Sequence, residues 1–199
     1  MKDKIKLIVG IIIILIAAFL YAYISKTHCI YDQEVDTSEY HDYSLEGSTS
    51  VSQTFVTNEK TLDGVRIKCR VQGTPSSELF YSLKDVETGE IVASGKVNAL
   101  EIKNSKFNEF PFSTVQGCAG KEYEFLLEAK EGTDENAIIL CYEEKQEDGT
   151  ELKINGEDRE GTLILKTITK RFDLETFCVL LIFIVYVIVF MKFLYRLFK

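Results

Sequence analysis

Histidine is the side chain that most often serves as acid or base near neutral pH, and the chain contains two, His28 and His41. A Ser-His-Asp or Cys-His site would need one of them folded against a domain beside a nucleophile. The motifs HExxH, GxSxG, GxxxxGK[ST] and GxGxxG do not occur. We therefore expect no catalytic residues and a protein that is not an enzyme.

Carboxylates are the other candidates for chemistry. The adjacent pairs Glu143–Glu144 and Asp134–Glu135 have the residue type that glycoside hydrolysis uses, but their acidic, loop-like surroundings favour a solvated surface. Residues 132–136 and 147–149 have the composition of calcium loops without the regular ligand spacing of a dedicated one. Turn formation alone explains Asp, Asn and Gly there. The sequence therefore predicts no metal and no cofactor, and leaves a structural calcium open.

The five cysteines form no CxxC motif and have no zinc-site spacing. Cys178 falls in an apolar segment near the C-terminus. One disulfide among Cys69, Cys118 and Cys141 is compatible with the sequence, and so are buried free thiols at these positions.

Two apolar segments lie near the ends of the chain. Residues 7–24 contain no charge, and at about 1.5 Å per residue they would extend roughly 27 Å, close to the thickness of a hydrocarbon core. No small-x-small cleavage site comes after them, so we expect an uncleaved anchor and not a signal peptide. In the second segment, 174–195, the run 177–195 is interrupted only by Lys192, whose ammonium can reach the headgroups. The sequence predicts two transmembrane helices.

Basic residues predict the orientation of these helices. Lys2, Lys4 and Lys6 precede the first segment, which places residues 1–6 in the cytoplasm by the positive-inside rule. The second span returns the chain, so residues 196–199 are expected in the cytoplasm and 26–171 outside. The predicted location is the plasma (cytoplasmic) membrane.

The charge of the chain also excludes one class of function. A net charge of −8 repels phosphate and argues against a nucleic-acid binder. Residues 26–171 hold 28 acidic and 17 basic side chains, which suits a solvated domain outside an anionic bilayer. Residues 25–48, with three tyrosines among acidic and hydroxyl side chains, are predicted to be a stalk.

Apolar residues between the two segments alternate with a period of two. Val65–Val71 and Tyr123–Ala129 each place apolar and polar side chains on opposite faces, as half-buried strands do. Turn signals such as Asn155-Gly156 separate the strands. The further predicted strands are Val51–Thr57, Leu79–Lys84, Ile91–Val97, Phe107–Phe112, Ile138–Tyr142, Leu152–Ile154 and Leu163–Ile168. We predict a mainly β protein, an antiparallel jelly-roll-like β-sandwich over 49–171 flanked by two transmembrane α-helices.

An aromatic side chain could serve a sugar, although the chain has no Trp. Phe80 shares a strand face with Ser82 and Lys84 and is expected to be exposed. A single surface aromatic residue needs no ligand to explain it.

An ordered set of segments carries a family resemblance. The segments are GSTSVSQTFVT (47–57), LDGVRIKCRVQG (62–73), LFYSLKDVETGEIVASGKV (79–97), FNEFPFS (107–113), KEYEFLLEA (121–129) and LKINGEDREGTLILKT (152–167). This order is similar to jelly-roll, galactose-binding-like modules found outside the membrane in bacterial proteins of cell-surface polysaccharide assembly, including large multi-span glycosyltransferases. This chain has no multi-span catalytic body, so the resemblance implies the fold without the enzymatic activity.

These observations lead to one functional hypothesis and two alternatives. We expect a non-enzymatic, membrane-anchored β-sandwich that acts as an accessory subunit, or as a ligand- or partner-binding module, in envelope polysaccharide assembly. Its expected partners are the lipid bilayer, a multi-span membrane protein and an envelope glycan. The alternatives are an envelope enzyme that uses loop carboxylates, and a chain-length regulator with the topology of polysaccharide co-polymerases. The strand pattern disfavours the regulator, because those proteins carry helical ectodomains.

Overall fold

The structure, a computed structural model, describes residues 2–130, 132–133 and 135–198. By their internal contacts they divide into two compact units. One is continuous, Thr27–Thr169, and the other joins the chain up to Lys26 with the chain from Lys170 onward.

The first sheet contains seven strands. Its main path runs β1 (Tyr23–Cys29), β13 (Leu165–Phe172), β4 (Thr61–Gln72), β9 (Ala137–Glu143) and β12 (Thr162–Leu163). Off this path, β2 (His41–Leu45) pairs with β9 and β7 (Lys106–Gln116) pairs with β4, both antiparallel. The long strand β4 is central because it contacts β7, β9 and β13 along its length.

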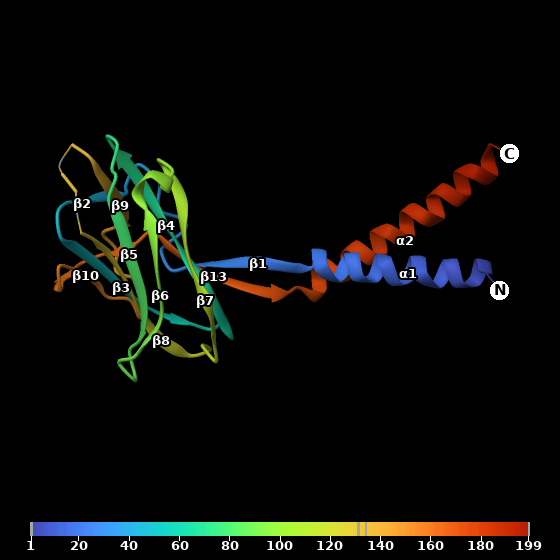
Figure 1. Cartoon of the computed structure of the whole chain (residues 1–199), viewed down its shortest axis with the longest axis horizontal. Coiled ribbons are helices and arrows are strands. Elements are labelled where there is room, and N and C mark those ends of the chain that lie inside the picture. Colours follow the sequence, from blue (N-terminus) through green and yellow to red (C-terminus); the bar gives the residue numbers. More distant parts are fainter. Residues whose placement is uncertain (1, 131, 134, 199) are drawn as a thin grey trace. The chain divides into compact units, whose positions relative to one another are not determined.

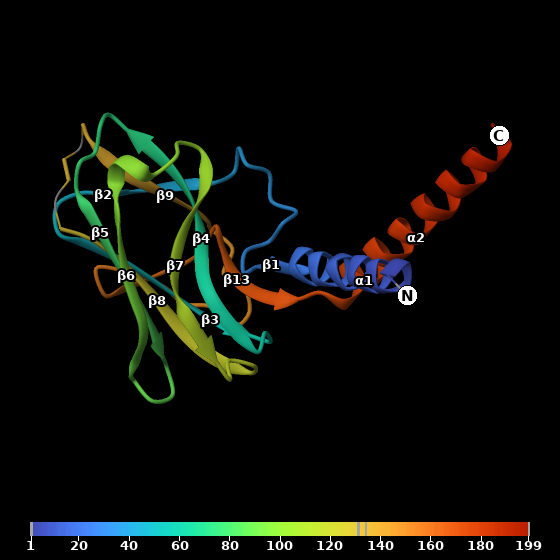
Figure 2. The ribbon, with the colours of Figure 1, turned by 45° about the vertical axis from the view of Figure 1, so that its right-hand side comes forward.

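The second sheet contains six strands, and the two sheets form the layers seen in Figures 1 and 2. Its order is β11 (Glu157–Arg159), β10 (Leu152–Ile154), β3 (Thr49–Thr57), β8 (Lys121–Ala129), β5 (Glu78–Asp85) and β6 (Ile91–Asn98). A short 3₁₀ turn, Ala99–Glu101, comes directly after β6. The predicted mainly β sandwich with antiparallel sheets is confirmed.

The alternating faces predicted from the sequence meet between the sheets. Ile67 of β4 and Leu127 of β8 are fully buried, and three rings pack together in the middle of the core. The rings of Tyr81, Phe110 and Phe125 lie 5.4–6.0 Å apart, centroid to centroid. Burial of these faces is the main source of stability for such a sandwich.

Every strand predicted in the range 51–168 coincides with strand residues of the structure, although one predicted strand is divided in two. Leu163–Ile168 is not one strand but two, β12 and β13, separated at Ile164. The Asn155-Gly156 turn also forms, with φ of 52° and 80°, which is the left-handed pair that a two-residue hairpin turn requires. Phe80, which was expected to be exposed, is half-buried, and Lys130 Nζ lies 4.0 Å from its ring centroid.

The predicted stalk, 25–48, is wrong in its local structure. It contains part of β1 and all of β2, and both strands pair within the first sheet. The reason is that His41, Tyr43 and Leu45 share one face of a short strand, β2, which pairs with an edge of β9 that is free on that side. Leu45 is fully buried there. Within 25–48, residues 30–40 remain as an irregular connection and residues 46–48 form the short link between β2 and β3.

The second unit contains the two helices, α1 (Lys2–Tyr21) and α2 (Leu174–Leu197). Within this unit Asp173 N–H donates to the Ala22 carbonyl (2.8 Å), and Phe19 stacks on Phe172 at 5.0 Å. Asp173 also caps α2, since its side chain accepts a hydrogen bond from Glu175 N–H.

Among the described residues, α2 alone is both long and apolar enough to cross a membrane. The apolar described part of α1, Ile8–Tyr21, is shorter, and the helix ends at Tyr21 where the sequence predicts a span to residue 24. Residues from Tyr23 on join β1, which is the reason for the early end.

Candidate functional site

The connection 30–40 is held against the first sheet by aromatic contacts. Tyr31 stacks on Phe107 of β7 with ring centroids 6.2 Å apart, and Tyr40 contacts Tyr31 edge-on at 6.5 Å. Lys166 of β13 places its Nζ 4.3 Å from the Phe107 centroid. Both ends of the connection are thus fixed on the sheet, while the side chains of 33–39 are exposed except that of Val35, which is half-buried.

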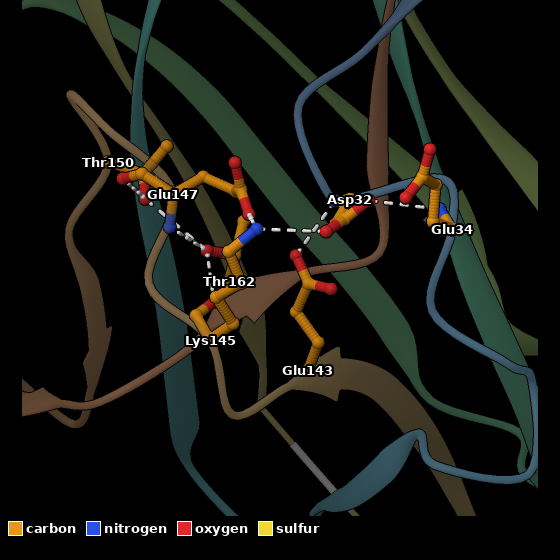
Figure 3. Close-up of polar contacts among 7 residues, drawn as sticks. All are labelled: Asp32, Glu34, Glu143, Lys145, Glu147, Thr150 and Thr162. Atoms are coloured by element: carbon orange, nitrogen blue, oxygen red, sulfur yellow. Dashed lines mark hydrogen bonds and ion pairs between the residues drawn. The ribbon is translucent and has the colours of Figure 1, made fainter.

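Asp32 ties this connection to the end of β9, as Figure 3 shows. Its amide N–H donates to Glu143 Oε1 (2.9 Å), and its Oδ2 accepts from Lys145 Nζ (2.8 Å). Asp32 Oδ1 also accepts from the Glu34 N–H (2.9 Å). The ammonium of Lys145 lowers the pKa of the Asp32 carboxyl, so Asp32 is ionised at neutral pH.

Lys145 is shared with a second carboxylate. Its Nζ lies 2.8 Å from Glu147 Oε1, and the two carboxylate contacts raise the pKa of Lys145. The backbone around it is fixed by Thr162, whose hydroxyl donates to the Lys145 carbonyl and accepts from the Glu147 N–H, both at 3.0 Å. Thr150 closes the turn by donating to the Glu147 carbonyl (2.7 Å). The positive charge of Lys145 is therefore balanced by its neighbours and held in place.

Glu143 is the unusual group of this cluster. It is 1% exposed, and its Oε2 has no hydrogen-bond partner although it is buried. Burial raises the pKa of the Glu143 carboxyl, as do the charges of Glu147 and Asp32; the Asp32 N–H and the more distant Lys145 cation oppose the rise. A buried carboxylate oxygen without a donor costs free energy, so this position is not explained by stability.

An open depression of about 460 Å³ adjoins Glu143. It lies between the connection 30–40 and the C-terminal end of β9 with the two residues beyond that end. The lining residues are Val35, Ser38, Glu39, Tyr40, His41, Glu143, Glu144 and Lys145. At its rim His41 Nε2 lies 3.3 Å from Glu144 Oε1, and the His41 ring lies 5.6 Å from the Tyr142 ring. This volume falls in the range of small-molecule sites.

The structure separates the candidates named from the sequence. His28 is exposed on β1, whereas His41 lies on β2 beside Glu144. Glu143 and Glu144, although adjacent, differ in environment: Glu143 is buried beneath the connection 30–40, and the side chain of Glu144 is 77% exposed. Both carboxylates line the same depression, but because one is buried and the other is exposed they do not form a matched pair.

The other carboxylate candidates do not assemble a site. Asp134 lies outside the described residues. The structure therefore does not test the pair Asp134–Glu135 or the complete stretch 132–136. In the stretch 147–149, Glu147 is paired with Lys145. Over the described chain, no group of three or more His, Cys, Asp or Glu side chains is placed to hold a metal ion.

All five cysteines are free thiols, so the disulfide that the sequence allowed is not formed in this structure. Cys69, Cys118 and Cys141 are buried. Burial raises the pKa of the Cys69 thiol to about 12 and that of Cys141 to about 11. Thiols with such values are poor nucleophiles at neutral pH.

Sequence reasoning missed Asp32, Tyr40 and Lys145, because they belong to a segment taken for a stalk or to an exposed turn. The available signal was the concentration of Tyr31, Tyr40 and Tyr43, which is more aromatic than a solvated stalk needs. Its consequence, that the segment packs on the sheet, depended on contacts with Phe107 and Lys166 far along the chain.

The fold and the site define the class of the protein: a β-sandwich with one apolar C-terminal helix and an acidic depression beside the connection 30–40. No family model matches the chain, and no curated protein matches it. Among solved structures it is similar to the cysteine protease and lectin-like domains of Cwp84, a surface layer associated protein of Clostridium difficile. That likeness has a TM-score of 0.34 and 13% identity over 68% of this chain, and it spans only 37% of the length of that chain.

Proposed function

We propose that this protein is a non-enzymatic binding module held at the outer face of a bacterial plasma membrane. The observation that carries the proposal is the depression beside the connection 30–40, an accessible volume lined by polar and aromatic side chains, in which Lys145 is held by Asp32 and Glu147. Preformed polar depressions of this kind suit recognition. The partner would be a multi-span membrane protein of polysaccharide assembly, or the glycan itself.

The proposed anchoring uses both helices. No side chain of α2 is buried and most of its apolar side chains are exposed, and so are most described apolar side chains of α1, as expected of surfaces covered by lipid or by a partner's helices. Three lysines at the start of the chain favour a cytoplasmic N-terminus. The sandwich and both helices would then form a hairpin with its ends in the cytoplasm.

Cysteine labelling in intact cells tests this topology. In a variant that carries Phe198→Cys we expect no reaction with a membrane-impermeant maleimide, whereas Lys103→Cys, on an exposed sandwich loop, should react. The unaltered chain with its five native thiols provides the baseline. Labelling of Phe198→Cys from outside would overturn the proposed orientation.

One observation favours the alternative of an envelope enzyme. His41, expected in a stalk, instead lies beside Glu144 and lines the same depression as Glu143. A histidine and two carboxylates around one volume are the residue types of acid–base catalysis.

Purification of the full chain in mild detergent, with mass spectrometry of the retained proteins and glycans, separates the two functions. For the binding module we expect a retained partner or glycan that Tyr40→Ala in the depression loses, while His41→Ala and Glu144→Gln keep it. The control is Ile91→Ala on β6, an exposed apolar side chain of the sandwich that is not part of the lining. A folded His41→Ala or Glu144→Gln protein that keeps its partner but loses all cellular function would overturn the proposal in favour of the enzyme.

A further inference from the structure

The buried Glu143 oxygen that lacks a hydrogen-bond donor is the strongest indication that this protein binds a ligand. Its Oε1 receives one hydrogen bond, from Asp32 N–H, while Oε2 receives none and is closed to solvent. Nearly all buried polar atoms in folded proteins have a partner. An ionised carboxylate can only accept hydrogen bonds, so its free oxygen needs a donor from elsewhere. The strongest such donor is a positively charged group.

The lining of the depression specifies the kind of donor. Three carboxylates, those of Glu39, Glu143 and Glu144, face one volume with the Ser38 hydroxyl. The one ammonium in the lining, Lys145, is already shared between two carboxylates. The three carboxylates of the lining therefore have less positive charge beside them than they could bind, and a cationic ligand would supply it.

A metal ion does not fit this donor set. The described residues contain no group of three His, Cys, Asp or Glu side chains placed for a metal, and Lys145 Nζ occupies the space between Asp32 and Glu147. Hard cations require several oxygen ligands at short distance. An ammonium group needs only a few acceptors.

The shape of the depression argues for a hydroxylated ligand over a peptide lysine. A lysine side chain ends in one ammonium and has no hydroxyl group, so it would leave Glu39 and Ser38 of the lining without a partner. A sugar ring carries hydroxyl donors that Glu39 and Ser38 can accept, and it offers C–H edges to a tyrosine face. The volume of about 460 Å³ accommodates such a ring.

Access to Oε2 requires the connection 30–40 to move. Between its fixed ends this segment has exposed side chains apart from that of Val35, so little packing opposes a displacement. Asp32 N–H and Lys145 would keep the base of the segment in place while its middle opens.

We propose that the depression binds a hexosamine with a free ammonium group, placed so that the ammonium pairs with Glu143 and the ring hydroxyls bind Glu39 and Ser38. This inference rests on the proposed binding function and names its ligand class. The ligand is either a free amino sugar or a de-N-acetylated residue of an envelope polysaccharide.

Saturation-transfer NMR on the full chain in detergent, with glucosamine, N-acetylglucosamine and glucose as probes, tests the proposal. We expect glucosamine to bind at least about tenfold more tightly than the other two, because only glucosamine carries the cation. In Glu143→Gln, of nearly the same shape, this preference should disappear while the variant stays folded, with a melting temperature no lower than that of the wild type. Glu34→Gln, an exposed carboxylate of the same segment outside the lining, is the matched control and should keep the preference.

Three results would overturn the proposal: equal binding of glucosamine and glucose, an unchanged preference in Glu143→Gln, or equally tight binding of lysine methyl ester. A chitosan oligomer that binds more tightly than glucosamine would identify the polymer as the source, and equal affinity the free sugar. If Tyr40-dependent partner retention persists without any preference for glucosamine, only this inference fails. If both are absent, the proposed function fails with it.

Discussion

Asp85 and Glu143 are the two least exposed carboxylates of the described residues, and their surroundings differ in one respect. Asp85, at the end of β5, is 3% exposed and has donors for both oxygens: Oδ1 accepts from the N–H groups of Glu87 and Thr88, and Oδ2 from Lys121 Nζ at 2.9 Å. Glu143 is 1% exposed and has a donor for only one oxygen. The first arrangement forms a turn; the second leaves an acceptor unused beside a depression.

The pKa values shift in opposite directions for this reason. The hydrogen bond from Lys121, together with those from the backbone, lowers the pKa of Asp85 from its ordinary value of 3.8. Burial raises the pKa of Glu143 from 4.5. Ionised Asp85 therefore stabilises the fold, whereas ionised Glu143 opposes it. The comparison suggests that a buried carboxylate serves structure where its oxygens are both satisfied, and serves binding where one is not.

Asp85→Ala should have the largest effect of the substitutions that test this comparison. It leaves two amide N–H groups and the Lys121 ammonium without their acceptor, so we expect the melting temperature of the full chain in detergent to fall by several degrees. Glu87→Ala, the exposed neighbour in the same turn, should change it little.

The pH dependence sharpens this test. Because its folded pKa is lowered, the stabilisation from Asp85 is fully present above pH 3.8 and is lost as the pH falls through the folded value. The difference between wild type and Asp85→Ala should be constant near neutral pH and should narrow in acid. A difference that widens in acid would contradict the assignment.

Glu143→Gln should have a smaller effect of opposite sign. It removes a poorly satisfied buried charge while it keeps an acceptor for Asp32 N–H, so near neutral pH we expect stabilisation by about 1 kcal/mol. Because the pKa of Glu143 is raised in the folded state, the wild type is most stable below pH 4.5, where this carboxyl is protonated. Its free energy of unfolding then falls as the pH rises through the folded pKa, and Glu143→Gln does not show this fall.

Urea titrations at a series of pH values measure this difference, with Glu144→Gln as the exposed control. Destabilisation of Glu143→Gln near neutral pH would show that Glu143 is a structural group like Asp85, and the contrast between the two would be lost.

The part of the fold that could be predicted from the sequence is the part with a local signal. Strands such as β8 alternate Tyr123, Phe125 and Leu127 with glutamates, so their faces can be assigned from the period of two. β1 has no such alternation of large apolar residues, and β2 is only five residues long. Both form because strands distant in sequence supply the edges, a contribution that no local pattern contains.

The site was accessible to prediction only in fragments. Glu143 and Glu144 were recognised as carboxylates, but their different burial depends on which strand face the connection 30–40 covers. That cover depends on Tyr31 reaching Phe107, across 76 residues of sequence. Residue type thus predicted which side chains are carboxylates, and tertiary contacts decided which of them are buried and which are exposed.

Lys145→Gln tests whether the connection 30–40 is held by charge. The substitution removes the ion pairs with Asp32 and Glu147, so we expect faster hydrogen exchange at the Asp32 amide and little change in the melting temperature. Lys153→Gln, which loses only longer contacts to Glu151 and Asp158 on the second sheet, is the control. Unchanged exchange would mean that the aromatic contacts of Tyr31 alone fix the segment.

Glu109→Gln should have the smallest effect, and it tests whether burial is the property that matters. Glu109 of β7 pairs with Arg66 of β4 at 2.9 Å, but both side chains are more than a third exposed. Exposed pairs gain little because water screens the charges, so we expect a change in the free energy of unfolding within about 0.5 kcal/mol that vanishes in high salt. Urea denaturation at low and high salt measures it. A cost as large as that of Asp85→Ala would show that pairing alone, without burial, decides the contribution of a carboxylate, and the contrast between Asp85 and Glu143 would then need another cause.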